Sequence, residues 1–300
     1  MESPHISVLL EESVEFFKDI SSGVVVDCTM GYGGHSSKIL EINGNINVIG
    51  IDRDIEAIDF CKDKFKNEKR ISFIHKSFSD GLKDIDPTDI RGIIADLGVS
   101  SLQLDKKERG FGFESNALDM RMDNTSPLTA EQVVNSYTEM ELADIFFNYG
   151  EVRESKKLAR EIVNARKIKR ITSPRELGEI CARCIKGGSI NPATLPFQAL
   201  RIVVNDELGE LERGLDIIEG FNDCYVSIIT FHSLEDRIVK QRFKKWSQNC
   251  ICPPEVMRCS CGNNNELGSI ITKKPLTAKD AEVRKNKRAR SAKLRIFKIR

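Results

Sequence analysis

The stretch "VVVDCTMGYGGHSSKIL", residues 24–40, passes from a β-branched apolar run through a glycine turn into helical spacing. A short apolar run before turn residues is typical of a buried strand, and apolar residues three and four apart are typical of a helix. Glycines at 31, 33 and 34 allow a ligand to approach the backbone closely where that helix begins. The stretch therefore predicts a strand, a ligand-binding turn and a helix in succession.

The same alternation continues as far as residue 97. β-branched runs bounded by turn residues occupy 46–52, 71–75 and 90–97, and a helical pattern precedes each of the first two. Strands that alternate with helices predict βαβ units, a parallel sheet and right-handed crossovers. We therefore predict an α/β fold with a doubly wound, Rossmann-like sheet.

The alternation stops in the middle of the chain. Residues 109–195 contain no convincing strand, and their apolar spacing predicts consecutive short helices. One of these begins at Ser173, which is followed by Pro174 and Glu176 in a helix-capping pattern. A longer helix is predicted at 196–218.

Strand character returns near the end of the chain. A strand is predicted at 224–231, followed by a helix, and two closing strands are predicted at 268–272 and 293–299. These patterns predict one sheet domain that is interrupted by a helical insertion. The sheet domain is assigned residues 1–105 and 196–300, and the inserted substrate-recognition domain residues 106–195.

The composition is that of an ordinary globular chain, with 40% apolar and 30% charged residues and a formal net charge of +1. No stretch is long and apolar enough to span a bilayer, and the nine cysteines are an odd number without a secretory signal. We therefore expect a reducing, cytoplasmic environment. Nine Lys and Arg residues and no acid lie between Arg284 and Arg300, which makes this segment a candidate for phosphate contacts.

Three aspartates end predicted strands: Asp27 the first, Asp52 the second and Asp96 the fourth. The carboxyl ends of parallel strands line the crevice where such sheets bind ligands, and Asp52 has the spacing of a carboxylate that accepts from ribose hydroxyls. Ser36 stands where the pyrophosphate-binding fingerprint G-x-G-x-x-G has its last glycine. Any one aspartate could simply cap a helix or begin a turn. Together they favour a ligand with a ribose, a positive centre and no phosphate, as in S-adenosylmethionine.

Seven blocks along the chain resemble a known family, the bacterial small-subunit ribosomal RNA cytosine-N4 methyltransferases (MraW/RsmH). The blocks are "HISVLLEESVEFF" (5–17), "DCTMGYGGHS" (27–36), "DLGVSSLQLD" (96–105), "RGFGFESNALDMRMD" (109–123), "ATLPFQALRIVVNDEL" (193–208), "FHSLEDRIVK" (231–240) and "RARSAKLR" (288–295). The resemblance implies a class I S-adenosylmethionine-dependent methyltransferase sheet with an inserted helical domain. It further implies methylation of the exocyclic N4 amine of a cytidine in the decoding region of 16S ribosomal RNA.

The resemblance also assigns site residues and partners. The cofactor-binding residues that it implies are Gly33, Gly34, His35, Asp52, Phe78, Asp96 and Gln103. The candidate catalytic residues, which would accept hydrogen bonds from the reacting amine, are Asp96 and Asp119. The implied partner is 16S ribosomal RNA within the small ribosomal subunit, with a homodimer as a candidate assembly and no membrane.

Other interpretations stay open for some of these residues. His35 could be an ordinary residue of a first helical turn, and Phe78 could belong to the core. Asp119 could form a structural charge pair with Arg121, and His232 in block 231–240 could serve packing or a turn. No Asp/Asn-Pro-Pro-aromatic tetrapeptide, which positions the amine in many amino-group methyltransferases, occurs in the chain.

The cysteines offer a second candidate site. Cys250, Cys252, Cys259 and Cys261 form a paired C-x-C pattern that could hold one tetrahedral zinc or could be free thiols in a loop. Most zinc pairs are separated by two or more residues, so the sequence leaves the metal undecided. Cys181 and Cys184, one helical turn apart, are expected to be buried packing residues.

Two rival functions belong to other classes. A nicotinamide-dependent oxidoreductase would share the sheet and Asp52, but would favour a glycine at Ser36 and a turn without Asp27. A non-catalytic RNA-binding ribosome-assembly factor could use the same fold, but would not need three strand-end acids around a cofactor pocket. The methyltransferase interpretation accounts for all of these residues.

Overall fold

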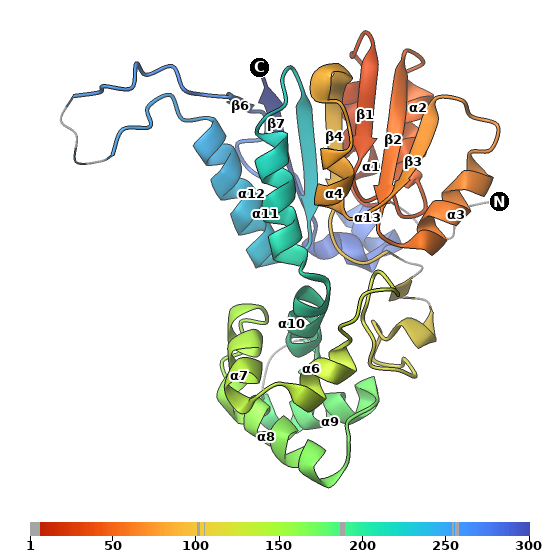
Figure 1. Cartoon of the computed structure of the whole chain (residues 1–300), viewed down its shortest axis with the longest axis vertical. Helices are drawn as coiled ribbons and strands as arrows, with labels where there is room; N and C mark the ends of the chain where they lie inside the picture. The colour runs from red at the N-terminus through yellow and green to blue at the C-terminus, as the bar shows by residue number, and fades with distance from the viewer. Residues whose placement is uncertain (1–6, 101–102, 105, 187–189, 254, 256–257) are drawn as a thin grey trace. The chain divides into compact units, whose positions relative to one another are not determined.

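The computed structural model describes residues 7–100, 103–104, 106–186, 190–253, 255 and 258–300 (Figure 1). Ser101, Leu102 and Asp105 of the block 96–105 therefore lie outside the described residues. The chain forms two compact units, one of Met1–Gly98 with Gly209–Arg300 and the other of Val99–Leu208. No helix of the described ranges combines the length and apolar character that crossing a membrane requires.

The first unit is built on a seven-stranded sheet in the order β3-β2-β1-β4-β5-β7-β6. Its strands are β1 (Gly23–Asp27), β2 (Ile46–Asp52), β3 (Ile71–His75), β4 (Ile90–Asp96), β5 (Tyr225–Thr230), β6 (Gly268–Ile270) and β7 (Lys293–Ile299). β1 to β5 are parallel, whereas β7 runs antiparallel to both β5 and β6. This is a doubly wound, Rossmann-like sheet, and it confirms the predicted fold class and all seven predicted strands.

Helices cover both faces of this sheet (Figure 1). One face packs on α1 (Leu10–Val14), α2 (Gly34–Ile42) and α3 (Ile55–Lys64), and the other on α4 (Phe78–Lys83), α11 (Glu207–Ile218) and α12 (Ser233–Trp246). Successive residues of β1 point to opposite faces of the sheet. Val25 packs in the core under α1, α2 and α3, and Val26 in the core under α4, α11 and α12. The remaining elements of this unit are α13 (Asp280–Lys285), η1 (Glu15–Phe17), η2 (Pro87–Asp89) and η4 (Lys287–Ser291).

The second unit is helical and has its own core. Its helices are η3 (Lys107–Arg109), α6 (Ala130–Ser136), α7 (Glu139–Asn148), α8 (Ser155–Ile168), α9 (Pro174–Cys184) and α10 (Thr194–Asn205). α9 begins with the expected capping box between Ser173 and Glu176. Cys181 and Cys184 are buried in the core of this unit, which confirms their packing role.

The predicted helix over 196–218 is wrong, because the structure has two helices there. Asp206 separates α10 from α11 in a left-handed conformation with φ of 49°. The ion pair between Arg201 and Glu207, with two N–O distances of 2.8 Å, spans the break. α10 packs into the core of the helical unit, so this unit extends over 99–208 rather than the expected 106–195.

Candidate active site

Three aspartates lie at one edge of the sheet. Asp27, Asp52 and Asp96 are the last residues of β1, β2 and β4. β1 pairs in parallel with both β2 and β4, so the three carboxyl ends are neighbours. The structure thus brings together the three acids that the sequence singled out, at the edge where doubly wound sheets bind ligands.

The glycine turn connects β1 to α2 at this edge. Gly33 has φ of 66°, which L side chains rarely adopt, and a Cβ there would lie 2.7 Å from the Phe65 ring. A Cβ on Gly34 would lie 1.9 Å from the Ser7 hydroxyl oxygen. Side chains are therefore excluded on steric grounds, and the backbone itself forms the surface of the turn.

Asp52 is fixed against the turn. Its Oδ2 accepts a hydrogen bond of 2.7 Å from the Gly31 N–H, and its Oδ1 accepts one of 2.8 Å from the Asp54 N–H. Burial raises the pKa of Asp52 to about 6. Each carboxylate oxygen keeps a further lone pair, so this side chain is oriented to accept from two neighbouring hydroxyls.

Asp27 is turned inward and bonded to the residue that replaces the third glycine. The Ser36 hydroxyl donates to Asp27 Oδ2 over 2.6 Å, and Asp27 is only 1% exposed. Burial raises the pKa of Asp27 to about 6. The sequence treated Ser36 only as a departure from a glycine pattern and missed this contact, although a hydroxyl in the first turn of the helix was a usable signal.

Asp96 has a buried oxygen, Oδ1, that no described group bonds. Its Oδ2 lies 4.0 Å from Nδ1 of His35. Burial, with repulsion from Asp27 and Glu235, holds the pKa of Asp96 well above its usual range. An unsatisfied buried carboxyl oxygen is costly, so its position at the ligand-binding edge points to a group that it would bind.

His35, which lies next to Asp96, does not carry a positive charge. Its Nε2 lies 3.2 Å from the Val8 carbonyl oxygen, and because a carbonyl only accepts, this nitrogen carries the proton. Burial lowers the pKa of His35 to about 4, so the ring is neutral near pH 7. His35 is thus a buried residue of the first turn of α2 whose second nitrogen faces Asp96.

The acidic edge consequently lacks a protein cation. Within the described ranges, no Lys or Arg forms an ion pair with any of these three aspartates. Lys64 lowers the pKa of Asp27 slightly, but its ammonium donates to the carbonyls of Tyr32 and Gly33. A cationic ligand would therefore compensate charges that the protein leaves uncompensated.

Phe78 lies in the core at the start of α4. The side chain is 5% exposed, and a Cβ on Gly214 of α11 would lie 2.7 Å from its ring. This placement agrees with the core interpretation, and a contact with adenine stays a prediction.

Sequence reasoning missed Glu210, which accepts from the N–H and hydroxyl of Ser79 at 2.7 and 3.1 Å. The sequence feature that could have revealed Glu210 is an acid among the buried positions of α11, next to Leu211.

His232 begins α12 as its N-cap. Glu235 accepts hydrogen bonds from the N–H groups of Phe231 and His232, at 2.8 and 3.3 Å, and its other oxygen lies 3.1 Å from His232 Nε2. The bonds from the backbone to Glu235 are the Glu half of a capping box. The turn interpretation therefore accounts for the backbone of His232, whereas neither buried ring nitrogen hydrogen-bonds a described group.

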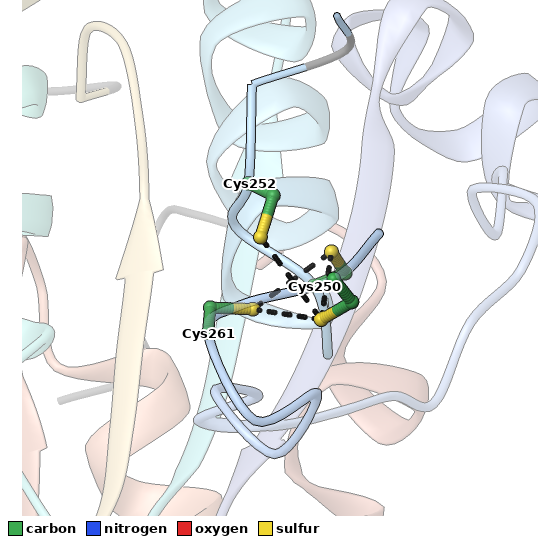
Figure 2. A group of neighbouring side chains, drawn as sticks. Cys250, Cys252 and Cys261 are labelled. Atoms are coloured by element: carbon green, nitrogen blue, oxygen red, sulfur yellow. Dashed lines mark hydrogen bonds between the residues drawn. The ribbon is translucent and has the colours of Figure 1, made fainter. Parts of the chain in front are cut away.

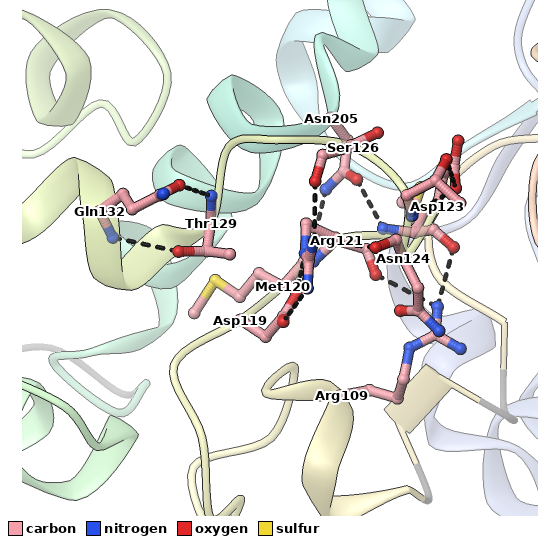
Figure 3. A network of polar contacts seen from close by, with 12 residues as sticks. Arg109, Asp119, Met120, Arg121, Asp123, Asn124, Ser126, Thr129, Gln132 and Asn205 are labelled. Atoms are coloured by element: carbon pink, nitrogen blue, oxygen red, sulfur yellow. Dashed lines mark hydrogen bonds and ion pairs between the residues drawn. The ribbon is translucent and has the colours of Figure 1, made fainter.

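Gln103 and Asp119 belong to the helical unit. Gln103 is buried, and its Oε1 accepts from the Ser100 N–H over 3.0 Å. Asp119 pairs with Arg121 through two bonds of 2.9 and 2.8 Å, as Figure 3 shows. Both oxygens of Asp119 thus accept from the Arg121 guanidinium, which agrees with the charge-pair interpretation. A cofactor contact of Gln103 stays a prediction.

The loop around Asp119 is held by α10 (Figure 3). The Asn205 side chain accepts from the Met122 N–H over 2.7 Å and donates to the Met120 carbonyl over 2.8 Å. Met120 has φ of 63°, which is a strained conformation for a residue with a side chain. The side chain of Asn205 thus joins the blocks 109–123 and 193–208, which lie far apart in the sequence.

Comparison with known proteins identifies the family. Residues 2–300 match the model of the MraW methylase family. The chain belongs to this family. Proteins named "Ribosomal RNA small subunit methyltransferase H" from Campylobacter concisus and Aliarcobacter butzleri are 54% and 53% identical to it, and each alignment covers 100% of both chains. The Sulfurovum protein of that name is 52% identical over 100% of this chain and 99% of its own.

The basic C-terminal segment is partly neutralised. Arg295 pairs with Asp236 over 2.7 Å, and Lys293 approaches the same carboxylate at 3.2 Å. The blocks 231–240 and 288–295 therefore meet on adjacent elements. Two further cations of the segment, Lys298 and Arg300, also pair with acids. Acids thus engage these four cations of the segment, and its phosphate contacts stay a prediction.

Proposed function

We propose that this chain transfers a methyl group from S-adenosylmethionine to the exocyclic N4 amine of a cytidine in the decoding region of 16S ribosomal RNA. The observation that carries the proposal is the buried, unpartnered Oδ1 of Asp96 at the acidic edge of a methylase sheet. The names of the relatives, which refer to small-subunit ribosomal RNA, support this choice of substrate.

S-adenosylmethionine matches the acidic edge by its chemistry. Asp52 accepts from the ribose hydroxyls, and the backbone of Gly33 and Gly34 lies against the cofactor. The sulfonium and ammonium groups of S-adenosylmethionine supply the positive charge that the protein does not place beside Asp96 and the neighbouring acids. The proposed contacts are completed by His35, Phe78 and Gln103.

The reaction needs alignment and a hydrogen-bond acceptor. The N4 lone pair of cytosine is delocalised into the ring, so the amine becomes nucleophilic only as it pyramidalises. Asp96 would accept a hydrogen bond from N4 as positive charge develops there, and would take up the proton that the methylated amine loses. The methyl group would come from the sulfonium of the cofactor, which would leave as a neutral thioether. Positioning of the two reactants can contribute about 7–11 kcal/mol. Asp96 alone is proposed as the acceptor, since Asp119 is already paired with Arg121.

Two thiols beside the acidic edge, Cys28 and Cys61, support transfer to an amine rather than to a ring carbon. Ring-carbon methylation of cytosine proceeds through attack by a thiolate. Burial raises the pKa of Cys28 well above its usual range and that of Cys61 to about 12, so both remain thiols. Transfer to an exocyclic amine requires no covalent enzyme adduct.

The proposed substrate is RNA in the small ribosomal subunit, which places the enzyme in the cytoplasm. The helical unit of residues 99–208 is the proposed substrate-recognition domain, and the basic residues of 284–290 are proposed phosphate contacts. The target base is unstacked before it enters the site. A homodimer is the candidate assembly, which light scattering at several protein concentrations would test.

The test uses isotopically labelled S-adenosylmethionine with purified small subunits and with free 16S RNA, followed by nucleoside analysis. N4-methylcytidine is expected, and Asp96→Asn is expected to lower the rate by at least about 10²-fold. Asp59→Asn is the matched control, because Asp59 is an exposed acid of α3. Labelled 5-methylcytidine or N6-methyladenosine would overturn the base assignment. RNA binding without any transfer would favour the assembly-factor alternative.

A further inference from the structure

The segment between α12 and β6 lacks a core of its own. None of its described residues between 247 and 267 is buried, and none belongs to a helix or strand. Its base is held by backbone hydrogen bonds from Leu267 to Trp246 at 2.8 Å and from Asn265 to Asn249 at 3.0 Å. Apolar packing therefore cannot explain a defined conformation at the tip of this segment.

Four cysteine side chains nevertheless converge at that tip (Figure 2). The sulfur of Cys259 lies 3.7 Å from that of Cys250, 4.0 Å from Cys252 and 3.4 Å from Cys261. The Cys250 and Cys261 sulfurs are 3.8 Å apart, and all four atoms lie within 4.8 Å of one another. The paired C-x-C pattern is thus brought into one cluster.

The sulfur separations fit a metal better than disulfides. Zinc binds thiolates at about 2.3 Å in a tetrahedron, so sulfurs around it lie about 3.8 Å apart. A disulfide requires an S–S distance of about 2.05 Å, which none of these pairs approaches. Four of the six separations, between 3.4 and 4.0 Å, therefore match the edges of a thiolate tetrahedron, and the other two lie within 4.8 Å.

Backbone groups also point at the sulfurs. The Ile251 N–H donates to Cys261 Sγ over 3.4 Å, and the Ser260 N–H donates to Cys252 Sγ over 3.3 Å. Such bonds orient thiolate ligands and offset part of their negative charge. Each pair of cysteines thus receives one N–H from the opposite C-x-C turn.

We propose that Cys250, Cys252, Cys259 and Cys261 bind one Zn²⁺ ion. All four ligands come from the protein, so the site is closed and structural and leaves no position for a reacting water. The metal supplies the free energy that orders this coreless segment. The zinc site is separate from methyl transfer, and its test does not depend on that activity.

The first measurement is the metal content of the purified full-length chain by inductively coupled plasma mass spectrometry. About one zinc per chain is expected, as for other four-cysteine sites. Iron in that amount would overturn the metal assignment, since four thiolates also suit a single iron. Absence of metal even after incubation with Zn²⁺ under reducing conditions would overturn the site.

Variants locate the metal. Replacing all four cysteines by serine is expected to remove the zinc, whereas Cys184→Ala, at a buried thiol of α9, is the matched control that keeps it. Retention of zinc by the four-serine variant would place the metal elsewhere.

Limited trypsin digestion gives a readout that does not require a variant. Arg258 is the single Lys or Arg between 247 and 267, and it lies between the two cysteine pairs. Chelation of zinc is expected to speed cleavage after Arg258 by at least about tenfold, because local unfolding exposes the site. Unchanged cleavage after metal removal would contradict the structural role.

Discussion

Replacing Asp27 by asparagine should stabilise the ligand-free protein at alkaline pH. The pKa of Asp27 is raised to about 6 because the side chain is buried, against 3.8 for the exposed group. A carboxyl with a raised pKa contributes full stability below its unfolded pKa, and this contribution is lost as the pH rises through the folded pKa. For Asp27 the loss occurs between about pH 4 and pH 6.

The size of the effect follows from the shift. About two pKa units correspond to about 3 kcal/mol between acid and pH 8, at 1.36 kcal/mol per unit. About half of this, roughly 1.4 kcal/mol, is lost between pH 5 and pH 8. Asparagine stays neutral at every pH and keeps an oxygen that accepts from the Ser36 hydroxyl.

Urea unfolding of the wild type and Asp27→Asn at pH 5 and pH 8 measures this directly. The advantage of the variant should be larger at pH 8 by about 1.4 kcal/mol. Asp59→Asn on the exposed face of α3 is the control and should show no such dependence. A difference that is constant with pH, or that shrinks toward pH 8, would refute the assignment of Asp27 as a buried, destabilising charge.

Three further predictions concern other parts of the molecule. Gly33→Ala should cost about 1–2 kcal/mol for its left-handed backbone, in addition to the clash with Phe65, and should weaken S-adenosylmethionine binding in calorimetry; unchanged affinity would contradict the role of the turn. Asn205→Ala should lower stability by about 1–3 kcal/mol in thermal unfolding, because the Met122 N–H loses its acceptor, and a neutral result would contradict the loop's dependence on α10. Binding of the cationic cofactor should release a proton from Asp96, whose pKa is raised in the free protein, so affinity should rise with pH. Equal binding heats in phosphate and Tris buffers would rule out that proton release.

The sheet could be predicted from local patterns because its strands are short β-branched runs between turn residues. The predicted limits 46–52, 71–75 and 293–299 match β2, β3 and β7. The break at Asp206 could not be predicted in this way, since apolar spacing continues across it. The packing of α10 into the helical core also depends on residues distant in the sequence, which local patterns do not reveal.

The acidic edge could be predicted because parallel strands end together. What each acid contacts depends on residues distant in the sequence, so the free oxygen of Asp96 and the neutral ring of His35 required the structure. The burial of Phe78 against Gly214 is equally non-local. The cysteine spacing indicated a site without deciding its geometry, which depends on the turns at both C-x-C pairs.

Calorimetric titration of the wild type and Asp52→Ala with S-adenosylmethionine, and separately with NAD, tests whether the acidic edge is the cofactor site. S-adenosylmethionine should bind the wild type and should bind the variant at least about tenfold more weakly, a loss of about 1.4 kcal/mol. NAD should not bind either protein. Binding of NAD, or S-adenosylmethionine affinity that is the same in both proteins, would contradict the assignment of this edge.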